Sequence, residues 1–172
     1  MFTFYRHEVV DVHRAALGAL GNLSCDSEVG RQAIVDADAL PEFARLLSSS
    51  DPRVLEYASM ALNNIAHEKS FNTFVIDASP CRPLVALLQC VYVLICAYEG
   101  LMFTFYRHEV VDVHREALRL LAKLSASSEV GRRAIIDADG LPEINRLLLS
   151  SDPRVRDYAS ITLDNLNRTV DC

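Results

Sequence analysis

The fold is decided by the stretch SEVGRQAIVDADALPEFARLLSSSDPRV (27–54), which returns as SEVGRRAIIDADGLPEINRLLLSSDPRV (128–155). The two stretches lie 101 residues apart, and the same register pairs MFTFYRHEVVDVHR (1–14) letter for letter with 102–115. In this register 46 of the 71 residues compared are identical. The chain therefore contains a long internal duplication, and such repeats decide the architecture before any single motif does.

A shorter period lies inside the duplicated unit. The segment AIVDADALPEFARLL (33–47) resembles FVIDASPCRPLVALL (74–88), at a shift of about 41 residues. The segment AALGALGNLS (15–24) resembles ASMALNNIA (58–66), at a shift of about 42 residues. A period in the low forties is typical of helical solenoids, in which each repeat stacks only on its neighbours.

These two periods divide the chain. We interpret residues 1–172 as a single domain, made of a duplicated unit (1–101) and a truncated second copy (102–172). Two short periods do not fill the first unit, and the remainder is an apolar insertion around 89–107.

Helix-start signals recur within each repeat. Ser27 precedes Glu28 as an N-cap would, and Pro41 fits the first turn of a second helix, where a missing N–H costs nothing. Asp51 before Pro52 marks the start of a third helix, and the same pair returns at 152–153. Along the third helix, apolar residues repeat at steps of three and four: Val54, Ala58, Ala61, Leu62 and Ile65. No segment is typical of a β-strand.

The order of a short helix, a turn, and then LP…LLSSSDP.V…A…L.NL is similar to the armadillo repeat, and the likeness covers most of the chain. The resemblance implies an all-α fold, a right-handed α-solenoid of about four armadillo-type helical repeats. A HEAT-like solenoid is the alternative, since the two families grade into each other. Two departures are evident: the first copy begins in the middle of a repeat, and the insertion interrupts the third one.

The insertion raises the question of a membrane. The apolar run at residues 84–106 is long enough to span a bilayer. However, Gln89 and Glu99 interrupt the run, and repeat sequence typical of a soluble protein flanks it on both sides. We therefore expect no membrane span, and instead an over-long second helix, a break near Gly100 and an apolar segment that docks on a neighbour. The same segment could join two chains into a homodimer, and the candidate self-association residues are Leu94, Tyr98, Phe103 and Phe105.

Composition narrows the partners and the compartment. The net charge of −6 comes without any long Lys/Arg run, which argues against a nucleic-acid partner. The five cysteines form an odd set without paired short spacing, and the N-terminus lacks the features of a signal peptide. We expect an intracellular protein, in the cytoplasm or the nucleus.

No motif indicates catalysis. The string HEVVD at 7–11 lacks the second His of a zinc-protease helix, and Cys81, Cys90 and Cys96 lack metal-ligand spacing. There is no Gly-rich phosphate loop and no nucleophile elbow. We expect no enzyme activity, no catalytic residue, no metal site and no cofactor.

The armadillo resemblance also implies a binding site. In that family the third helices line a concave groove, and an Asn on each holds the backbone of an extended peptide, because an amide both donates and accepts hydrogen bonds. The matching positions in this sequence are Asn22, Asn64, Lys123 and Asn165. The plainer alternative is that an Asn near a helix end bonds only a neighbouring segment of the same chain.

The partner of such a groove is less defined. The importin-alpha-like pattern needs Trp four residues before each Asn, and this chain has no Trp, which argues against nuclear-import cargo. A basic stripe of Arg115, Arg119 and Lys123 instead resembles the beta-catenin-like use of the fold with acidic peptides. The stripe could equally be a solvated face, and Glu116 could pair with Arg119.

Three interpretations of function follow. The first is a non-catalytic protein–protein interaction scaffold that binds an extended, perhaps acidic, segment of another protein. The alternative is a self-associating structural repeat. The near-verbatim duplication leaves a third, in which the chain is a recombined product without a partner of its own.

Overall fold

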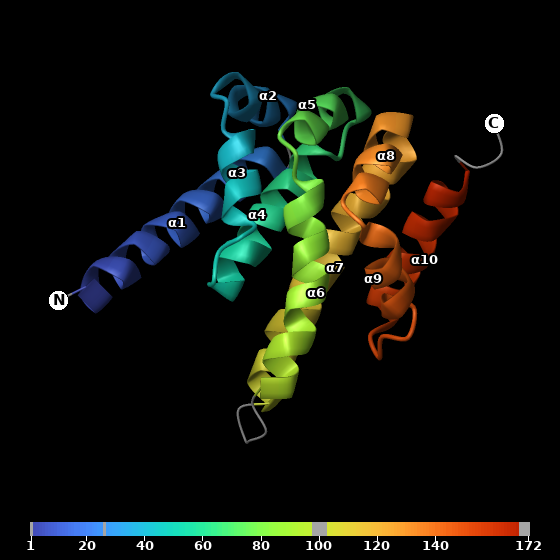
Figure 1. Cartoon of the computed structure of the whole chain (residues 1–172). Coiled ribbons are helices and arrows are strands. Elements are labelled where there is room, and N and C mark those ends of the chain that lie inside the picture. The colour runs from blue at the N-terminus through green and yellow to red at the C-terminus, as the bar shows by residue number, and fades with distance from the viewer. Residues whose placement is uncertain (1, 26, 98–102, 169–172) are drawn as a thin grey trace.

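The computed structural model describes the backbone of residues 2–25, 27–97 and 103–168, and the side chains of residues 10–25, 27–89 and 111–168. Within these ranges every regular element is helical, and the helices stack side by side into one elongated array (Figure 1). The prediction of an all-α fold is confirmed for the part of the chain that is described.

The elements follow one another in a regular order. They are α1 (Phe2–Cys25), α2 (Glu28–Asp36), α3 (Leu40–Leu46), α4 (Pro52–Ile65), the 3₁₀ turn η1 (Lys69–Phe71), α5 (Asn72–Asp77), α6 (Cys81–Ala97), α7 (Phe103–Ser127), α8 (Glu129–Asp137), α9 (Gly140–Leu147) and α10 (Pro153–Asn167). Three complete repeats result, α2–α3–α4, α5–α6–α7 and α8–α9–α10, and α1 is a third helix that precedes them.

The third helices form the spine of the stack. Helix α1 packs on α4, α4 packs on α7, and α7 packs on α10 (Figure 1). Within each repeat the second helix packs on the third helix: α3 on α4, α6 on α7 and α9 on α10. This arrangement matches the period read from the sequence, because each repeat contacts mainly its own helices and its neighbours.

The predicted helix starts are present. Ser27 Oγ accepts a hydrogen bond from Gly30 N at 3.0 Å, and Ser128 repeats it at the start of α8. Asp51 accepts from the first backbone amides of α4, and Asp152 accepts from Val155 N at 3.0 Å in α10. These side chains satisfy amides that no helical carbonyl can reach, so α2, α4, α8 and α10 each begin at a fixed residue.

One turn is repeated in all three complete repeats. One or two residues before each second helix, the backbone is left-handed, with φ of 52° at Asp38, 58° at Ser79 and 58° at Asp139. Asp is among the few non-glycine residues that adopt this conformation without great cost. The same backbone turn therefore connects the first helix to the second in all three repeats.

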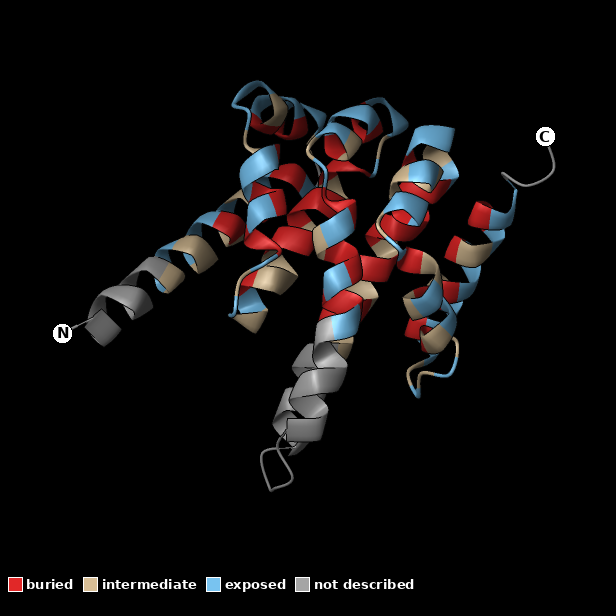
Figure 2. Ribbon diagram, viewed as in Figure 1, coloured by how far each residue is buried: buried red, intermediate tan, exposed pale blue. Residues whose placement is uncertain are grey.

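The core runs along the middle of the array, where the third helices meet the helices that cover them (Figure 2). The predicted stripe on α4 is fully enclosed, with Val54, Ala58 and Ile65 at 0% exposure. The small Ala58 and its counterpart Ala159 let neighbouring helices approach closely, as interdigitated helix packing requires.

Two glycines mark the closest approach between repeats. A Cβ added to Gly30 would lie 2.1 Å from the carbonyl oxygen of Leu23, and one added to Gly131 would lie 2.2 Å from that of Leu124. The first helices α2 and α8 therefore press directly on the ends of the preceding third helices, α1 and α7. Only glycine fits at these two positions.

The insertion lengthens two helices. Helix α6 has 17 residues, whereas its counterparts α3 and α9 have 7 and 8, so the expected over-long second helix is present. Residues from Phe103 onward form the beginning of the 25-residue α7 rather than a separate docking segment. The expected self-association residues (Leu94, Tyr98, Phe103 and Phe105) lie outside the described side chains.

The apolar character of this region does not amount to a membrane span in the described chain. Among the helices that the structure describes, none is both long and apolar enough to cross a bilayer.

Candidate protein-binding surface

The residues predicted to bind a peptide lie in register on the four stacked third helices. Each helix contributes one residue to a row that we call the amide row: Asn22 on α1, Asn64 on α4, Lys123 on α7 and Asn165 on α10. One helical turn earlier lies a second row: Gly18, Met60, Arg119 and Ile161. We call the two rows together the third-helix surface.

The three asparagines of the amide row have different surroundings. Asn22 is exposed and Asn64 is half-buried, whereas Asn165 is only 7% exposed. Asn64 donates its amide N–H to the carbonyl oxygen of Gly21 at 3.1 Å. Asn165 makes the equivalent bond to Ala122 O at 3.3 Å and a further one to Ser125 Oγ at 3.2 Å.

These bonds tie neighbouring third helices together. Gly21 and Ala122 are equivalent positions of the duplicated unit. The same bond therefore forms between α1 and α4 and between α7 and α10. An asparagine amide has two N–H donors and a carbonyl oxygen. Asn64 therefore holds α1 with one donor and keeps hydrogen-bonding capacity at the surface, while Asn165 directs its donors into the stack.

At the equivalent position on α7 the chain has Lys123 instead of an asparagine, and this side chain also donates a hydrogen bond to a neighbouring third helix. Its Nζ donates to the carbonyl oxygen of Asn63, at the end of α4, at 2.7 Å. A cation at a helix C-terminus is stabilised by the carbonyls exposed there. Burial, aided by the charge of Arg119 and opposed by that of Glu116, lowers the pKa of Lys123 to about 8.

The rest of the basic stripe is also paired. Arg115 forms an ion pair with Asp112, and Arg119 lies 3.3 Å from Glu116, the pairing expected from the sequence. Both arginines remain partly exposed, with 26% and 32% of the side chain accessible. An incoming carboxylate would therefore share these guanidinium groups with carboxylates already present, rather than meet bare charges.

A hydrogen bond between α4 and α7 was not predicted from the sequence. Asn63 donates its side-chain amide to the backbone oxygen of Glu116 at 2.8 Å and to Glu116 Oε2 at 3.1 Å. Glu116 thus contacts both Asn63 and Arg119. The Asn63-Asn64 pair is the signal in the sequence, but its two amides point to different neighbours, which only the helix register reveals.

Carboxylates crowd the surface beside this junction. Burial first, and then the charges of Asp112 and Glu116, raise the pKa of Glu56 on α4, while Arg53 and Arg115 act in the opposite direction. The charges on this part of the surface therefore alternate in sign along and across the helices. Within the described residues, no group of three or more His, Cys, Asp and Glu side chains is arranged to hold a metal ion.

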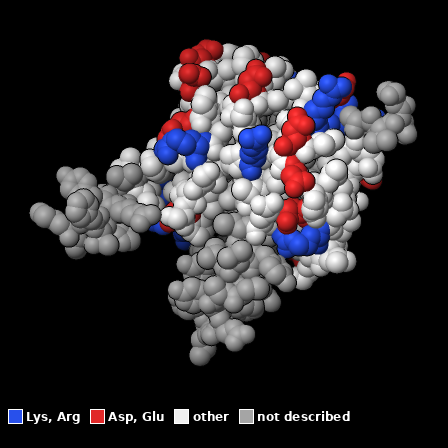
Figure 3. Space-filling view, viewed as in Figure 1, with Lys and Arg blue, Asp and Glu red and all other residues white. Residues whose placement is uncertain are grey.

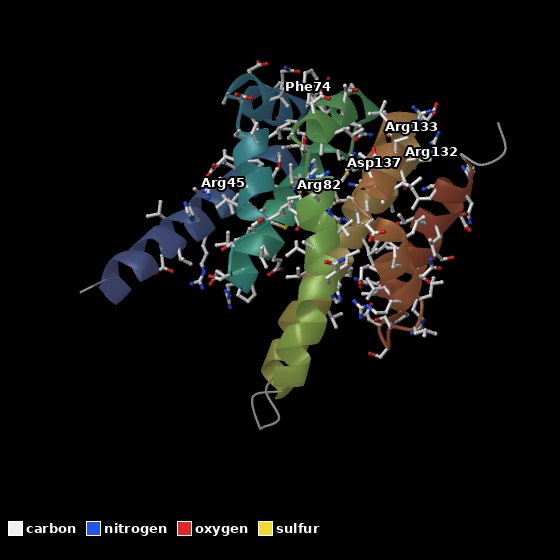
Figure 4. The ribbon with its side chains drawn as sticks, in the orientation of Figure 1. Arg45, Phe74, Arg82, Arg132, Arg133 and Asp137 are labelled. Carbon is white, nitrogen blue, oxygen red and sulfur yellow. The ribbon has the colours of Figure 1, made fainter. Side chains whose placement is uncertain are left out.

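A second surface, which first and second helices form, carries mixed charge. In Figure 3 basic and acidic side chains are interspersed over the described part of the visible face. Figure 4 places Arg45 on α3, Arg82 on α6 and Arg133 on α8 along it, and Arg45 and Arg133 form ion pairs with Glu42 and Glu129.

Comparison with known proteins defines the class. Residues 27–67 match the model of the Armadillo/beta-catenin-like repeat family. Vacuolar protein 8 of Schizosaccharomyces pombe is 33% identical over 143 residues, which are 83% of this chain and 22% of that protein. Importin subunit alpha-6 of Arabidopsis thaliana is 29% identical over 163 residues, which are 94% of this chain and 27% of that protein.

Solved structures agree with the sequence matches. The crystal structure of an engineered protein is similar with a TM-score of 0.71 and 28% identity, over 89% of this chain and 55% of that one. Together with the match to residues 27–67, this shows that the chain is an α-solenoid of armadillo-type repeats. The chain spans only about a quarter of the length of the two natural relatives.

Proposed function

We propose that this chain is a non-catalytic binding module that holds an extended segment of another protein against its third-helix surface. Armadillo-type repeats generally mediate protein–protein binding, and the described residues of this chain follow that architecture. The observation that supports the proposal is the amide row, which places one polar side chain at the same level on each of four adjacent third helices.

The geometry suits an extended chain. Neighbouring packed helices lie about 8–10 Å apart, and an extended peptide advances about 3.3 Å per residue. A segment that crosses all four third helices would therefore contain about nine residues. Exposed Asn22 and half-buried Asn64 would make the first contacts with its backbone, whereas Asn165 would have to leave its bonds with α7 before it reached a ligand.

Side chains around the amide row suggest what the segment carries. The partly exposed Arg115, Arg119 and Lys123 favour acidic side chains near α7. The neighbouring row adds apolar contacts from Met60 and from Ile161, which is 47% exposed. The proposed ligand is thus a protein segment that combines acidic and apolar residues, bound inside the cell.

The test selects ligands without assuming a partner. Random 12-residue peptides displayed on phage are selected on the immobilised chain, and the affinities of the winners are measured by fluorescence anisotropy for the wild type and for Asn64→Ala and Arg119→Glu. We expect acidic winners, and about a tenfold or greater loss of affinity with Arg119→Glu, since reversing a charge removes an attraction and adds a repulsion. Binding should also weaken as the pH rises above about 8, where Lys123 loses its charge.

A matched control keeps the test specific. Val130→Asp changes a side chain that is 63% exposed on α8, and it should leave peptide affinity unchanged. Circular dichroism melting curves report whether each variant is folded. Peptides that bind Arg119→Glu and the wild type equally, with both folded, would place the binding site elsewhere and end the proposal.

A further inference from the structure

Charged residues alternate in sign across the four third helices, at two levels that precede the amide row. The level eight positions before the amide row consists of Arg14 on α1, Glu56 on α4, Arg115 on α7 and Asp157 on α10. The level three positions earlier has the opposite order of signs: Asp11, Arg53, Asp112 and Arg154. Because the signs alternate both along and across the helices, we call these eight residues the checkerboard surface.

Neighbouring members of the checkerboard surface lie close to one another. Within α7, Arg115 forms an ion pair with Asp112. Across the junction between α4 and α7, the charges of both Asp112 and Arg115 act on the pKa of Glu56. Arg53, one turn before Glu56 on α4, acts on the same carboxyl group. The two levels are therefore in register where the two copies of the duplicated unit meet.

The side chains of the checkerboard surface are accessible. Four of them are exposed and four are half-buried; the exposed ones are Asp11, Arg53, Arg154 and Asp157. On α10, neither Arg154 nor Asp157 forms an ion pair with any residue that the structure describes. The charges at this end of the surface are therefore available to an incoming molecule.

A checkerboard of charge is complementary to a second copy of itself. Consider a two-fold axis that runs across the four helices, between the two levels. Arg154 then faces Asp157 of the second copy, and Asp157 faces Arg154 of the second copy, as an isologous contact requires. The same exchange occurs on α1, α4 and α7, so all eight charges meet the opposite sign. An extended peptide that crosses the helices follows one level only, whereas a second copy matches both levels at once.

We propose that the checkerboard surface is a weak, salt-sensitive interface at which a second copy of this chain docks face to face. The eight charges sum to zero, so this surface does not add to the repulsion between chains of net charge −6. Exposed ion pairs contribute little individually, and the dimer is therefore transient rather than permanent. The amide row lies eight residues further along each third helix, about 12 Å away, so the dimer contact is separate from the surface proposed to hold a peptide.

Sedimentation equilibrium of the full chain tests the interface at two salt concentrations. Raising the NaCl concentration from about 0.1 M to about 1 M shortens the screening length from about 10 Å to about 3 Å. At the lower concentration, repulsion between distant charges is already screened, but contacts between opposed side chains are not. We expect dimers at chain concentrations up to about 1 mM, and a dissociation constant at least about tenfold higher in 1 M NaCl.

Substitutions on α10 test the pairing of charges without breaking an ion pair within the described chain. Asp157→Arg places like charges opposite each other twice, because of the two-fold symmetry, and should weaken the dimer at least about tenfold. Adding Arg154→Asp to Asp157→Arg exchanges the two signs, so the double variant should dimerise within about threefold of the wild type. Asp137→Arg is the matched control, since it makes the same charge change at an exposed position on α8 and should dimerise like the wild type.

Four results would overturn the proposal, provided that circular dichroism shows each variant to be folded. The first is a monomer at every concentration in 0.1 M NaCl. The second is a dimer that neither salt nor Asp157→Arg weakens, which would assign association to an apolar surface such as the insertion around 89–107. The third is a double variant that stays monomeric, which would mean that the two levels do not face each other. The fourth is an equal loss with Asp137→Arg, which would make net charge the cause.

Discussion

At the scale of single residues, we expect opposite effects on stability when two helical glycines are replaced by alanine. A Cβ at Gly131 would lie 2.2 Å from a backbone oxygen, whereas one at Gly18 meets nothing within 4 Å. We expect Gly131→Ala to destabilise the fold by about 2 kcal/mol or more, because the backbone must move. Gly18→Ala should stabilise it by about 0.5–1 kcal/mol through lower chain entropy in the unfolded state. Urea unfolding measures both, and similar midpoints for the two variants would contradict the close packing at Gly131.

A buried histidine predicts how stability depends on pH. His114 is 7% exposed, and its Nε2 has no hydrogen-bond partner among the described residues. Burial, with the nearby charge of Arg146, lowers the pKa of His114 to about 4. Between about pH 6.5 and pH 4, His114 is protonated in the unfolded chain but stays neutral in the folded chain. The free energy of unfolding therefore falls by up to about 3 kcal/mol as the pH drops through this range.

His114→Gln tests this dependence, and the duplicated unit supplies the control. We expect the free energy of unfolding to change less between pH 7 and pH 4.5 in His114→Gln than in the wild type, by denaturant titration at each pH. His13→Gln alters the half-buried counterpart in α1 and is the matched control. If the free energy of unfolding changed equally with pH in all three proteins, other groups would account for the loss of stability at low pH.

At the scale of elements, Asp51 links two third helices. It caps α4 and also accepts hydrogen bonds from Arg14 of α1, with Arg14 Nε to Oδ1 at 3.0 Å. Burial alone would raise the pKa of Asp51, but the bonds from Arg14 and from the α4 amides outweigh it and lower the pKa. Asp51→Asn keeps the capping oxygen and removes the charge, so it should cost about 1 kcal/mol from the lost ion pair.

The copy of this junction gives the comparison. Asp152 caps α10, but Arg115 of α7, the counterpart of Arg14, is paired with Asp112. Asp152→Asn should therefore change the melting temperature less than Asp51→Asn, as scanning calorimetry would show. An equal effect of the two substitutions would mean that capping alone accounts for both.

The elements were predicted well where local chemistry sets them. Ser27, Pro41 and Asp51 mark helix starts through bonds within a few residues, and those starts are in the structure. The continuation of the insertion into α7 was not predicted, because an apolar run does not reveal whether it forms a separate segment or lengthens a helix. The identical residues at the start of α1 are helical as well, although the elements that pack on α1 are α4 and α2.

At the scale of the whole molecule, the repeat period alone predicted the stack of helices, since each repeat needs its neighbours to bury its core. The binding surface was less accessible to prediction. The row of Asn22, Asn64, Lys123 and Asn165 could be aligned from the sequence, but not which amides the stack itself occupies. That depends on sub-ångström placement of helices that are 43 residues apart in the chain.

The repeated bond between third helices also bears on how such a chain can grow. Asn64 reaches Gly21 at one junction, and Asn165 reaches Ala122 at the other, by the same geometry. Each of these bonds lies within one copy of the 101-residue unit, whereas the two copies meet where α7 packs on α4 and Lys123 Nζ donates to the carbonyl oxygen of Asn63. A further complete copy would meet its neighbour through that same α4–α7 interface. The addition of whole units would need no new kind of contact and would leave the existing junctions unchanged.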